Sequence, residues 1–227
     1  MELWEGLIKA IHLILTLDSE VMEITGRSLA ISVTSCIIST LISLPLGSLI
    51  HFSNFWGKRA VISTIQTLFS LPTVLVGLFV FVFFSRAGLL GGLNLMFTPV
   101  VMVAGQIVLV TPLILGFIIS ALKGVDKGVT ETAISLGASR FQASILTLNE
   151  ARYAVLTAVV MGFGRAISEV GLAMMVGGNI RDFTRTLTTA IALETSKGAI
   201  ELSLALGMIL LFIALVINVA LNRLQQR

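Results

Sequence analysis

Charged side chains are scarce in this sequence and are missing altogether from four long stretches. Asp, Glu, Lys and Arg make up 12% of the 227 residues, whereas soluble domains carry about 25%. The stretches without charge are residues 28–50, 60–85, 87–122 and 202–222. Because roughly 20 apolar residues cross a bilayer as a helix, this pattern excludes an ordinary soluble domain and predicts a membrane protein.

The residues that build most catalytic and metal sites are also few. The single cysteine, Cys36, lies in the first stretch without charge, and the two histidines, His12 and His51, are far apart. The sequence contains neither a G-x-x-x-x-G-K-[ST] phosphate loop nor a G-x-S-x-G nucleophile turn. These absences predict a chain that is not an enzyme and binds no metal or cofactor. Its basic residues are spread along the chain, with a net charge of +3, so nothing indicates a nucleic-acid partner.

The apolar runs predict an all-α membrane protein with about five transmembrane helices. We expect these helices at residues 24–50, 60–84, 98–121, 153–177 and 199–222. Pro45, Pro72 and Pro112 lie within the first three. Proline removes a backbone hydrogen bond inside a helix, so kinks are expected at these positions.

Residues 1–23 form a separate N-terminal segment. Between residues 3 and 17 an apolar helical face is interrupted by Glu5, Lys9 and His12. The segment is too short to span comfortably, so it predicts an interfacial helix, with a short extra span as the alternative. The segment begins with acidic residues and has no small-residue cleavage site after its apolar part, so no cleavable signal peptide is expected.

Lysine and arginine indicate which side of the membrane each loop occupies. If the 51–59 loop, the polar segment 122–152 and the tail 223–227 share one side, that side holds eight of these residues. The other side holds six, and the N-terminal segment is rich in acidic residues. The bias predicts that the polar segment and the tail are cytoplasmic and that the N-terminus lies outside.

The polar segment 122–152 is too small to be an enzyme domain. Glu131, Ile134 and Arg140 are expected along one short amphipathic helix, and Gly137 allows a tight change of direction between two short helices. An apolar face for a partner is expected from Phe141, Ile145, Leu146 and Leu148. The segment therefore predicts a compact helical unit, here called the knuckle, at the membrane surface.

The spacing Glu131-x-Ala133-x-x-x-Gly137, followed by Leu148, resembles the "EAA" loop of the membrane subunits of ABC importers. The resemblance implies a coupling helix that seats on an ATP-binding subunit. By the same resemblance, the contact residues are Glu131, Ala133, Gly137, Ala138, Ser139, Phe141 and Leu148. The sequence has Asn149 where the family usually has proline, which predicts a different start for the fourth span.

Three further stretches resemble the molybdate, tungstate and sulfate branch of these permeases: ISLPLGSLI, SLPTVLVGL and GRAISEVGLAMMVGGNI. A fourth, GGNIRDFTRTLTTAIALET, looks most like tungstate permeases. The resemblance implies a type I importer permease in a prokaryotic cell membrane, working as a homodimer around one pore. It also implies two ATP-binding cassette subunits that use ATP and Mg inside, and an oxyanion-binding protein outside. Tungstate, molybdate and sulfate all remain open as substrates.

Two charged residues, Arg165 and Glu169, lie in the middle of the fourth expected span. Their spacing places both on one helical face, and each costs about 2.5–3.5 kcal/mol at mid-bilayer. One interpretation is that Arg165 lends positive potential to an oxyanion path while Glu169 positions it. The other is a salt bridge that fixes the span against a neighbour. The nearby Gly162, Gly164 and Gly171 favour close helix packing over a gate.

The outer stretch 177–198 supplies two further candidates for the translocation path, Arg181 and Arg185. Their positive field would meet an oxyanion arriving from outside, and hydroxyl donors are expected from Thr184, Thr186, Thr188 and Thr189. A solvated loop whose charges are balanced by Asp182, Glu194 and Glu201 is the alternative. An intramembrane enzyme or an ion-driven carrier is disfavoured, because Glu169 is the one carboxylate clearly within a span.

Overall fold

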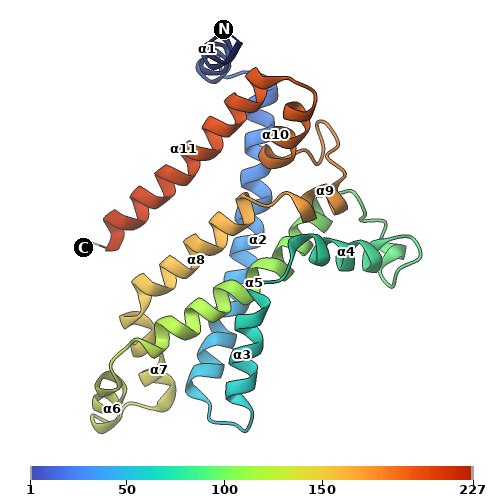
Figure 1. Ribbon diagram of the computed structural model, residues 1–227. Helices are drawn as coiled ribbons and strands as arrows, with labels where there is room; N and C mark the ends of the chain where they lie inside the picture. Colours follow the sequence, from blue (N-terminus) through green and yellow to red (C-terminus); the bar gives the residue numbers. More distant parts are fainter. Residues whose placement is uncertain (1, 226–227) are drawn as a thin grey trace.

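Three long helices form the frame of the molecule (Figure 1). They are α2 (Ser19–Phe52), α5 (Pro99–Lys123) and α11 (Ile200–Gln225). Each contains a stretch long and apolar enough to cross a membrane, which confirms the first, third and fifth expected spans. The computed structural model describes residues 2–225 and has no strand among them; Gln226 and Arg227 of the expected tail lie outside these residues.

The second and fourth expected spans are broken rather than continuous. The second consists of α3 (Lys58–Leu68) and α4 (Thr73–Phe84), bent by 97°. The fourth consists of α8 (Arg152–Ile167) and α9 (Gly171–Gly177), bent by 58°. If each bent pair is one span, the described residues make up to five. The expectation of one helix over 60–84 and one over 153–177 was therefore wrong.

The first break has a local cause. Pro72 stands immediately before α4 with φ −60° and ψ 126°, and a proline disfavours helical backbone at the residue before it. The second break contains no proline, and its cause is tertiary, as shown below for Glu169. A kink was expected at Pro72, but the chain instead ends one helix and starts another there.

Several of the shorter helices lie at the two ends of the molecule, whereas α4 and α9 lie beside its middle (Figure 1). One end carries α1 (Glu2–Leu15) and α10 (Leu187–Ser196). The opposite end carries α6 (Lys127–Ser135), α7 (Arg140–Glu150) and the loop between α2 and α3. A short 3-10 turn, η1 (Gly91–Leu93), precedes α5. The 51–59 loop and the polar segment thus lie at the same end, as grouped, and the side of the membrane that this end faces stays a prediction. Helix α10 forms within a stretch where no helix was predicted.

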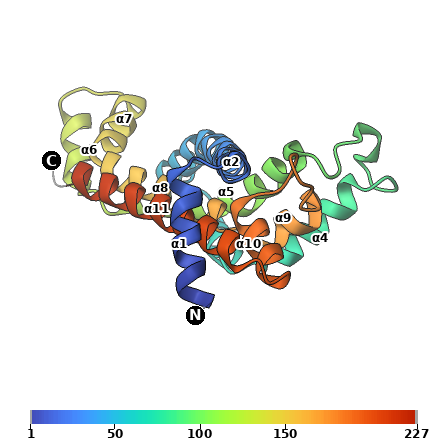
Figure 2. The ribbon, with the colours of Figure 1, turned by 90° about the horizontal axis from the view of Figure 1, so that it is seen from above.

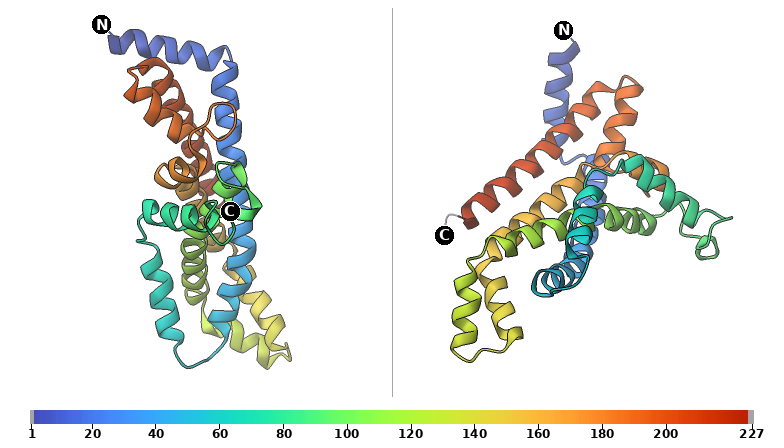
Figure 3. Two further views of the ribbon diagram at one scale, coloured as in Figure 1. Left: turned by 90° about the vertical axis from the view of Figure 1, so that its right-hand side faces the viewer. Right: turned by 60° about the horizontal axis from the view of Figure 1, so that its bottom comes forward.

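Helix α1 lies almost crosswise to α2 (Figure 3) and passes over the start of α11, against which it packs (Figure 2). Its 14 residues extend about 21 Å, too little to cross a hydrocarbon core of about 30 Å. Trp4, Ile8 and Leu15 remain exposed on it. The interfacial position of this helix stays a prediction, and its crosswise direction agrees with it.

The most extensive helix contact joins α2 to α5, and it includes a stripe of small residues. On α2 the buried stripe is Ser28, Ser32, Ser35, Ser39, Ser43 and Gly47. A Cβ atom at Gly47 would come within 2.8 Å of Ile118. Small side chains allow membrane helices to approach closely, so this stripe sets the distance between the two helices.

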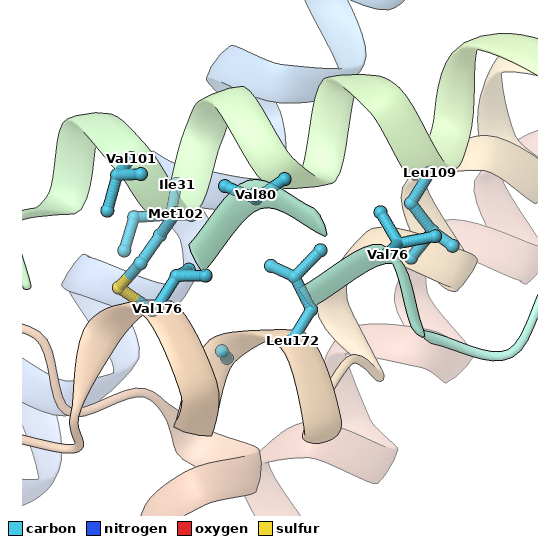
Figure 4. Packing of buried hydrophobic residues seen from close by; sticks show 9 residues of the cluster. Ile31, Val76, Val80, Val101, Met102, Leu109, Leu172 and Val176 are labelled. Carbon is cyan, nitrogen blue, oxygen red and sulfur yellow. The ribbon is translucent and has the colours of Figure 1, made fainter. Parts of the chain in front are cut away.

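The two broken spans pack on each other through a buried cluster (Figure 4). Leu172 of α9 lies between Val176 of the same helix and Val76 of α4 in this view. Gly77 and Gly105 leave the room that Leu172 fills, because a Cβ at either would lie about 3 Å from it. The cluster holds the short helices α4 and α9 in place, and with them the break that precedes α9.

Candidate functional site

The knuckle is a pair of short helices, α6 and α7, joined by a turn at Gly137. Gly137 has φ +91°, a conformation that glycine adopts without strain. Its N–H donates to the carbonyl of Ile134, and the N–H of Ala138 donates to that of Ala133. These two bonds form a Schellman motif, which ends α6. The predicted tight turn at Gly137 between two short helices is confirmed.

Both helices of the knuckle begin with a side-chain cap. The Asp126 carboxylate accepts from the N–H of Gly128 at 2.6 Å. Ser139 opens α7 with a capping box. Its hydroxyl accepts from the backbone N–H of Gln142, and the side-chain oxygen of Gln142 accepts from the backbone N–H of Ser139. Such caps typically stabilise a helix by about 1 kcal/mol, so the chain itself encodes this unit.

Helices α6 and α7 pack against each other through small, buried side chains. Ala133 and Ala143 are buried, and the hydroxyls of Thr130 and Thr147 lie 3.0 Å apart across the two helices. Leu148 packs against the core cluster of α2, α5 and α8. A displacement of the knuckle would therefore be transmitted to the membrane-spanning helices through this contact.

The outer face of the knuckle is apolar and exposed. Leu136 and Phe141 are 84% and 75% exposed, and Ile134, Ile145 and Leu146 are also exposed. Glu131 lies exposed on α6. These side chains lie on two sides of the knuckle: Phe141 and Ile145 line a hollow against the end of α2 together with Leu148, whereas Leu136 and Leu146 line another beside α6. Exposed apolar side chains of this kind mark interaction surfaces. The expected set needs two corrections: Arg140 begins α7 and so does not share a helix with Glu131 and Ile134, and Leu146 does not share the face of Phe141, Ile145 and Leu148.

Asn149 lies within α7. It occupies the position at which the EAA loop of importer membrane subunits usually has proline. The chain passes from α7 to α8 through the single residue Ala151. The Arg152 guanidinium reaches the Asn149 side chain at 3.4 Å. The absence of proline thus lets α7 run on almost to the start of the fourth span.

Arg165 and Glu169 meet at the break in the fourth span. Arg165 lies in the last turn of α8, and its Nη1 donates to Glu169 Oε2 at 2.9 Å. The other oxygen, Oε1, accepts from the N–H of Leu172 at 2.8 Å. The Glu169 side chain is 2% exposed and that of Arg165 is 30% exposed. The pair forms as the spacing predicted, but Glu169 follows the end of α8 and does not continue its helical face.

Glu169 gives the physical reason for this break. Its carboxylate satisfies both a guanidinium and one of the free N–H groups at the start of α9, while Thr188 Oγ1 donates to its backbone carbonyl at 2.6 Å. A carboxylate at a helix N-terminus is also favoured by the helix dipole. These contacts stabilise the non-helical backbone between α8 and α9.

Gln106 joins the same region and was missed by the sequence analysis. Its Nε2 donates to the carbonyl of Ala166 at 3.1 Å, and its Oε1 accepts from Ser35 Oγ at 2.7 Å. The side chain is buried and links α5 to α2 and α8. The signal available was a lone side-chain amide within the expected span 98–121, since buried polar side chains need partners.

Arg181 and Arg185 are brought together by a third residue, Glu20 at the start of α2. Glu20 lies 2.8 Å from Arg181 and 3.4 Å from Arg185. Arg185 is buried and also lies 3.6 Å from Glu194, which Lys197 contacts at 2.9 Å. The expectation of charge balance holds for Glu194, whereas Glu201 pairs with Lys9 instead.

The threonines of this outer stretch do not face solvent. Thr184, Thr186, Thr188 and Thr189 are all buried. Thr184 donates to the carbonyl of Gly177, and Thr189 accepts from the N–H of Thr186. The hydroxyls of these threonines bond to backbone groups, including the Glu169 carbonyl, or to one another, and an anion contact by them stays a prediction. Among the described residues no group of three His, Cys, Asp or Glu side chains could hold a metal.

Comparison with known proteins places this architecture in a family. Residues 43–227 match the model of the family described as "Binding-protein-dependent transport system inner membrane component". A "Probable anion ABC transporter permease protein" of Haloferax volcanii is 40% identical over 211 residues, covering 91% of each chain. The "Tungstate uptake system permease protein TupB" of Peptoclostridium acidaminophilum is 39% identical, covering 98% of this chain and 97% of its own.

Solved structures show the same fold. A chain of a bacterial ABC transporter involved in the import of the acidic polysaccharide alginate superposes with a TM-score of 0.76 at 19% identity. The match covers all of this chain and 89% of the other. The expected fold class, an all-α type I importer permease, is confirmed. The chain belongs to the family of binding-protein-dependent transport system inner membrane components.

Proposed function

We propose that this chain is the membrane-spanning permease subunit of an ATP-driven importer for a tetrahedral oxyanion, and that this oxyanion is tungstate. The observation that carries the proposal is similarity over nearly the whole chain to two relatives named as tungstate uptake permeases, 39% and 33% identical. Relatives named for molybdenum and sulfate transport are 30% and 28% identical and cover only 75% and 78% of this chain. Molybdate or sulfate is therefore the second candidate substrate.

The permease works as a homodimer in this proposal. Three continuous spans and two broken ones are few for enclosing a polar path, so the pore lies between two copies. Helix α4 leaves a broad apolar surface exposed, including Leu78, Phe79 and Phe83. Such a surface needs lipid or a second copy to cover it.

The knuckle is the contact with the ATPase in this proposal. Two ATP-binding cassette subunits, which bind ATP and Mg, seat on the exposed outer face around Leu136 and Phe141, with Glu131 at its edge. Leu148 passes the movement to the membrane core, since it packs there. ATP binding draws the two knuckles together and opens the pore outward, and hydrolysis resets it. The knuckle is then cytoplasmic, and α1 and α10 face outward toward an oxyanion-binding protein.

Arg165 contributes positive potential to the oxyanion path, and Glu169 positions it. The support is that the Arg165 side chain is 30% exposed, whereas the Glu169 side chain beside it is almost fully buried. A pairing carboxylate also keeps the arginine from binding a passing anion too tightly, because it reduces the local positive charge. Arg181 and Arg185 act as positioning residues for the outer end through Glu20, rather than as free anion ligands.

ATP hydrolysis in lipid vesicles tests this function. The chain is reconstituted with its cognate ATPase and binding protein, and tungstate, molybdate, sulfate and phosphate are added separately. We expect tungstate to stimulate hydrolysis at the lowest concentration, and the double variant Glu131→Gln/Gly137→Ala to lose this stimulation. Arg86→Gln, on an exposed loop away from the knuckle, serves as the matched control and retains it.

The outcomes separate the candidates. Stimulation by molybdate or sulfate alone would keep the importer and discard tungstate. Oxyanion uptake by the chain without any ATPase would instead indicate an ion-driven carrier. Lack of stimulation by all four anions, in an assembled complex, would contradict the substrate class.

A further inference from the structure

A basic hollow lies where three membrane helices end together. It has a volume of about 510 Å³ and lies between the loop that follows α2, the start of α3 and the end of α5. Its lining includes Trp56, Lys58, Arg59 and Lys123, and no acidic residue. Because α2, α3 and α5 belong to candidate spans, their shared ends mark the level of the membrane surface.

The positive charge in this hollow is not neutralised by the protein. Arg59 and Lys123 are both exposed, and no carboxylate among the described residues lies within ion-pair distance of either. This contrasts with the opposite end of the molecule, where Arg181 and Arg185 are paired with Glu20. Two free cations in one hollow favour an anionic occupant.

Lys58 shapes the hollow rather than adding a third free cation. Its ammonium donates to the carbonyls of His51 and Ser53 at 2.6 and 2.9 Å. These bonds satisfy carbonyls at the end of α2, where a cation is favoured. They also tie the loop to the helix, so Trp56 and Arg59 are held in position.

Trp56 indicates the nature of the occupant. Its side chain is fully exposed, and Phe55 beside it is also exposed. Exposed tryptophan at the end of a membrane helix is typical of the headgroup region, where an amphipathic ring is favoured. A free inorganic anion would not need this apolar rim, whereas a phospholipid offers both a phosphate and the adjoining acyl region.

We propose that this hollow binds the headgroup of an anionic phospholipid, with Arg59 and Lys123 contacting its phosphate and Trp56 lying beside its acyl chains. The proposal does not depend on which oxyanion is transported. Basic residues beside a membrane helix are attracted to anionic lipid by about 1 kcal/mol each, or about fivefold in relative binding. Two free cations therefore give a selective site rather than a general surface attraction.

The fluorescence of Trp56 can report on lipid bound in the hollow. It contains two tryptophans, so the variant Trp4→Phe leaves Trp56 as the single indole. This variant of the full chain is reconstituted in nanodiscs of phosphatidylcholine with a minority of phosphatidylglycerol. Either lipid is brominated near the headgroup end of its acyl chains, and quenching of Trp56 by each is compared. We expect phosphatidylglycerol to be favoured by about 25-fold, which is about fivefold for each of the two free cations.

Four variants of this chain sharpen the test. Arg59→Gln and Lys123→Gln should each reduce the preference by about fivefold, and the pair together should remove it. Arg86→Gln removes one exposed charge from another loop and should leave the preference unchanged. Inorganic phosphate, added to discs of phosphatidylcholine alone, should leave Trp56 fluorescence unchanged.

Three results would overturn the proposal. Equal quenching by the two lipids in the starting variant would show that the hollow has no lipid preference. A phosphate-dependent change would indicate a site for a free oxyanion. If the preference disappears when the ATPase subunits are bound, the hollow is a protein contact in the assembled transporter.

Discussion

The carboxylate of Glu169 holds two groups at once: the Arg165 guanidinium at 2.9 Å and the N–H of Leu172 at 2.8 Å. The first bond reaches back to the end of α8 and the second caps the start of α9. One buried side chain therefore stabilises both the charge in the membrane and the break in the helix. The two contributions can be separated by substitution.

We expect Glu169→Ala to lower the free energy of unfolding more than Glu169→Gln. Alanine removes the cap, worth about 0.5–2 kcal/mol, together with the partner of Arg165. Glutamine keeps an oxygen that can accept from Leu172 and loses only the charge. Thermal unfolding of the purified chain in detergent measures both variants. Equal destabilisation by the two substitutions would show that the cap contributes little.

Arg165 can be tested for a role in the anion path by its own variants. Arg165→Gln should abolish oxyanion-stimulated ATP hydrolysis while ATPase association stays intact, and Arg165→Lys should restore part of it because the charge returns. The measurement is hydrolysis in vesicles at several oxyanion concentrations. Normal stimulation in both variants, at normal expression, would leave Arg165 with a structural role only.

The buried amide of Gln106 should stabilise the contact between α2, α5 and α8. Gln106→Met keeps the volume but removes two hydrogen bonds, so we expect a loss of about 1–2 kcal/mol. Ser35→Ala should cost less, because Gln106 keeps its bond to Ala166. Denaturation of both single variants and the double variant gives their coupling. Strict additivity would show that the two side chains do not act as one network.

Gly137→Ala should destabilise the knuckle through backbone strain alone. A Cβ atom there meets nothing within 4 Å, but φ is +91°, and left-handed backbone costs other residues about 1–2 kcal/mol. Gly124→Ala is the matched control, since Gly124 has φ −76° and alanine is compatible there. Hydrogen exchange over residues 127–150 should rise in the first variant and not in the second. Unchanged exchange in Gly137→Ala would contradict the strain argument.

Phe141→Ala should weaken ATPase association without unfolding the chain. The ring is 75% exposed, so its loss should change stability by no more than about 0.5 kcal/mol. Leu89→Ala removes an equally exposed apolar side chain from another loop and serves as the control. Co-purification of the ATPase with each variant measures the effect. If both variants retain the ATPase equally, Phe141 is not part of the contact.

The knuckle was largely predictable because its signals are local. Gly137, Ser139 and Gln142 act within a few residues of one another through a positive φ and a capping box. The partial burial of Leu148 against the membrane core was not predictable, because that contact depends on α2, α5 and α8. Gln106 was missed for the same reason, since both its partners are at least 60 residues away in sequence.

The sequence by itself determined that this chain is a membrane protein, where its long helices run and where the knuckle turns. These features follow from apolar length and from the backbone preferences of single residues. Only the tertiary structure decided that Glu169 breaks the fourth span and that Glu20 pairs with Arg181, 161 residues away. Both outcomes depend on which buried polar group finds which partner, and that choice is made when distant helices pack together.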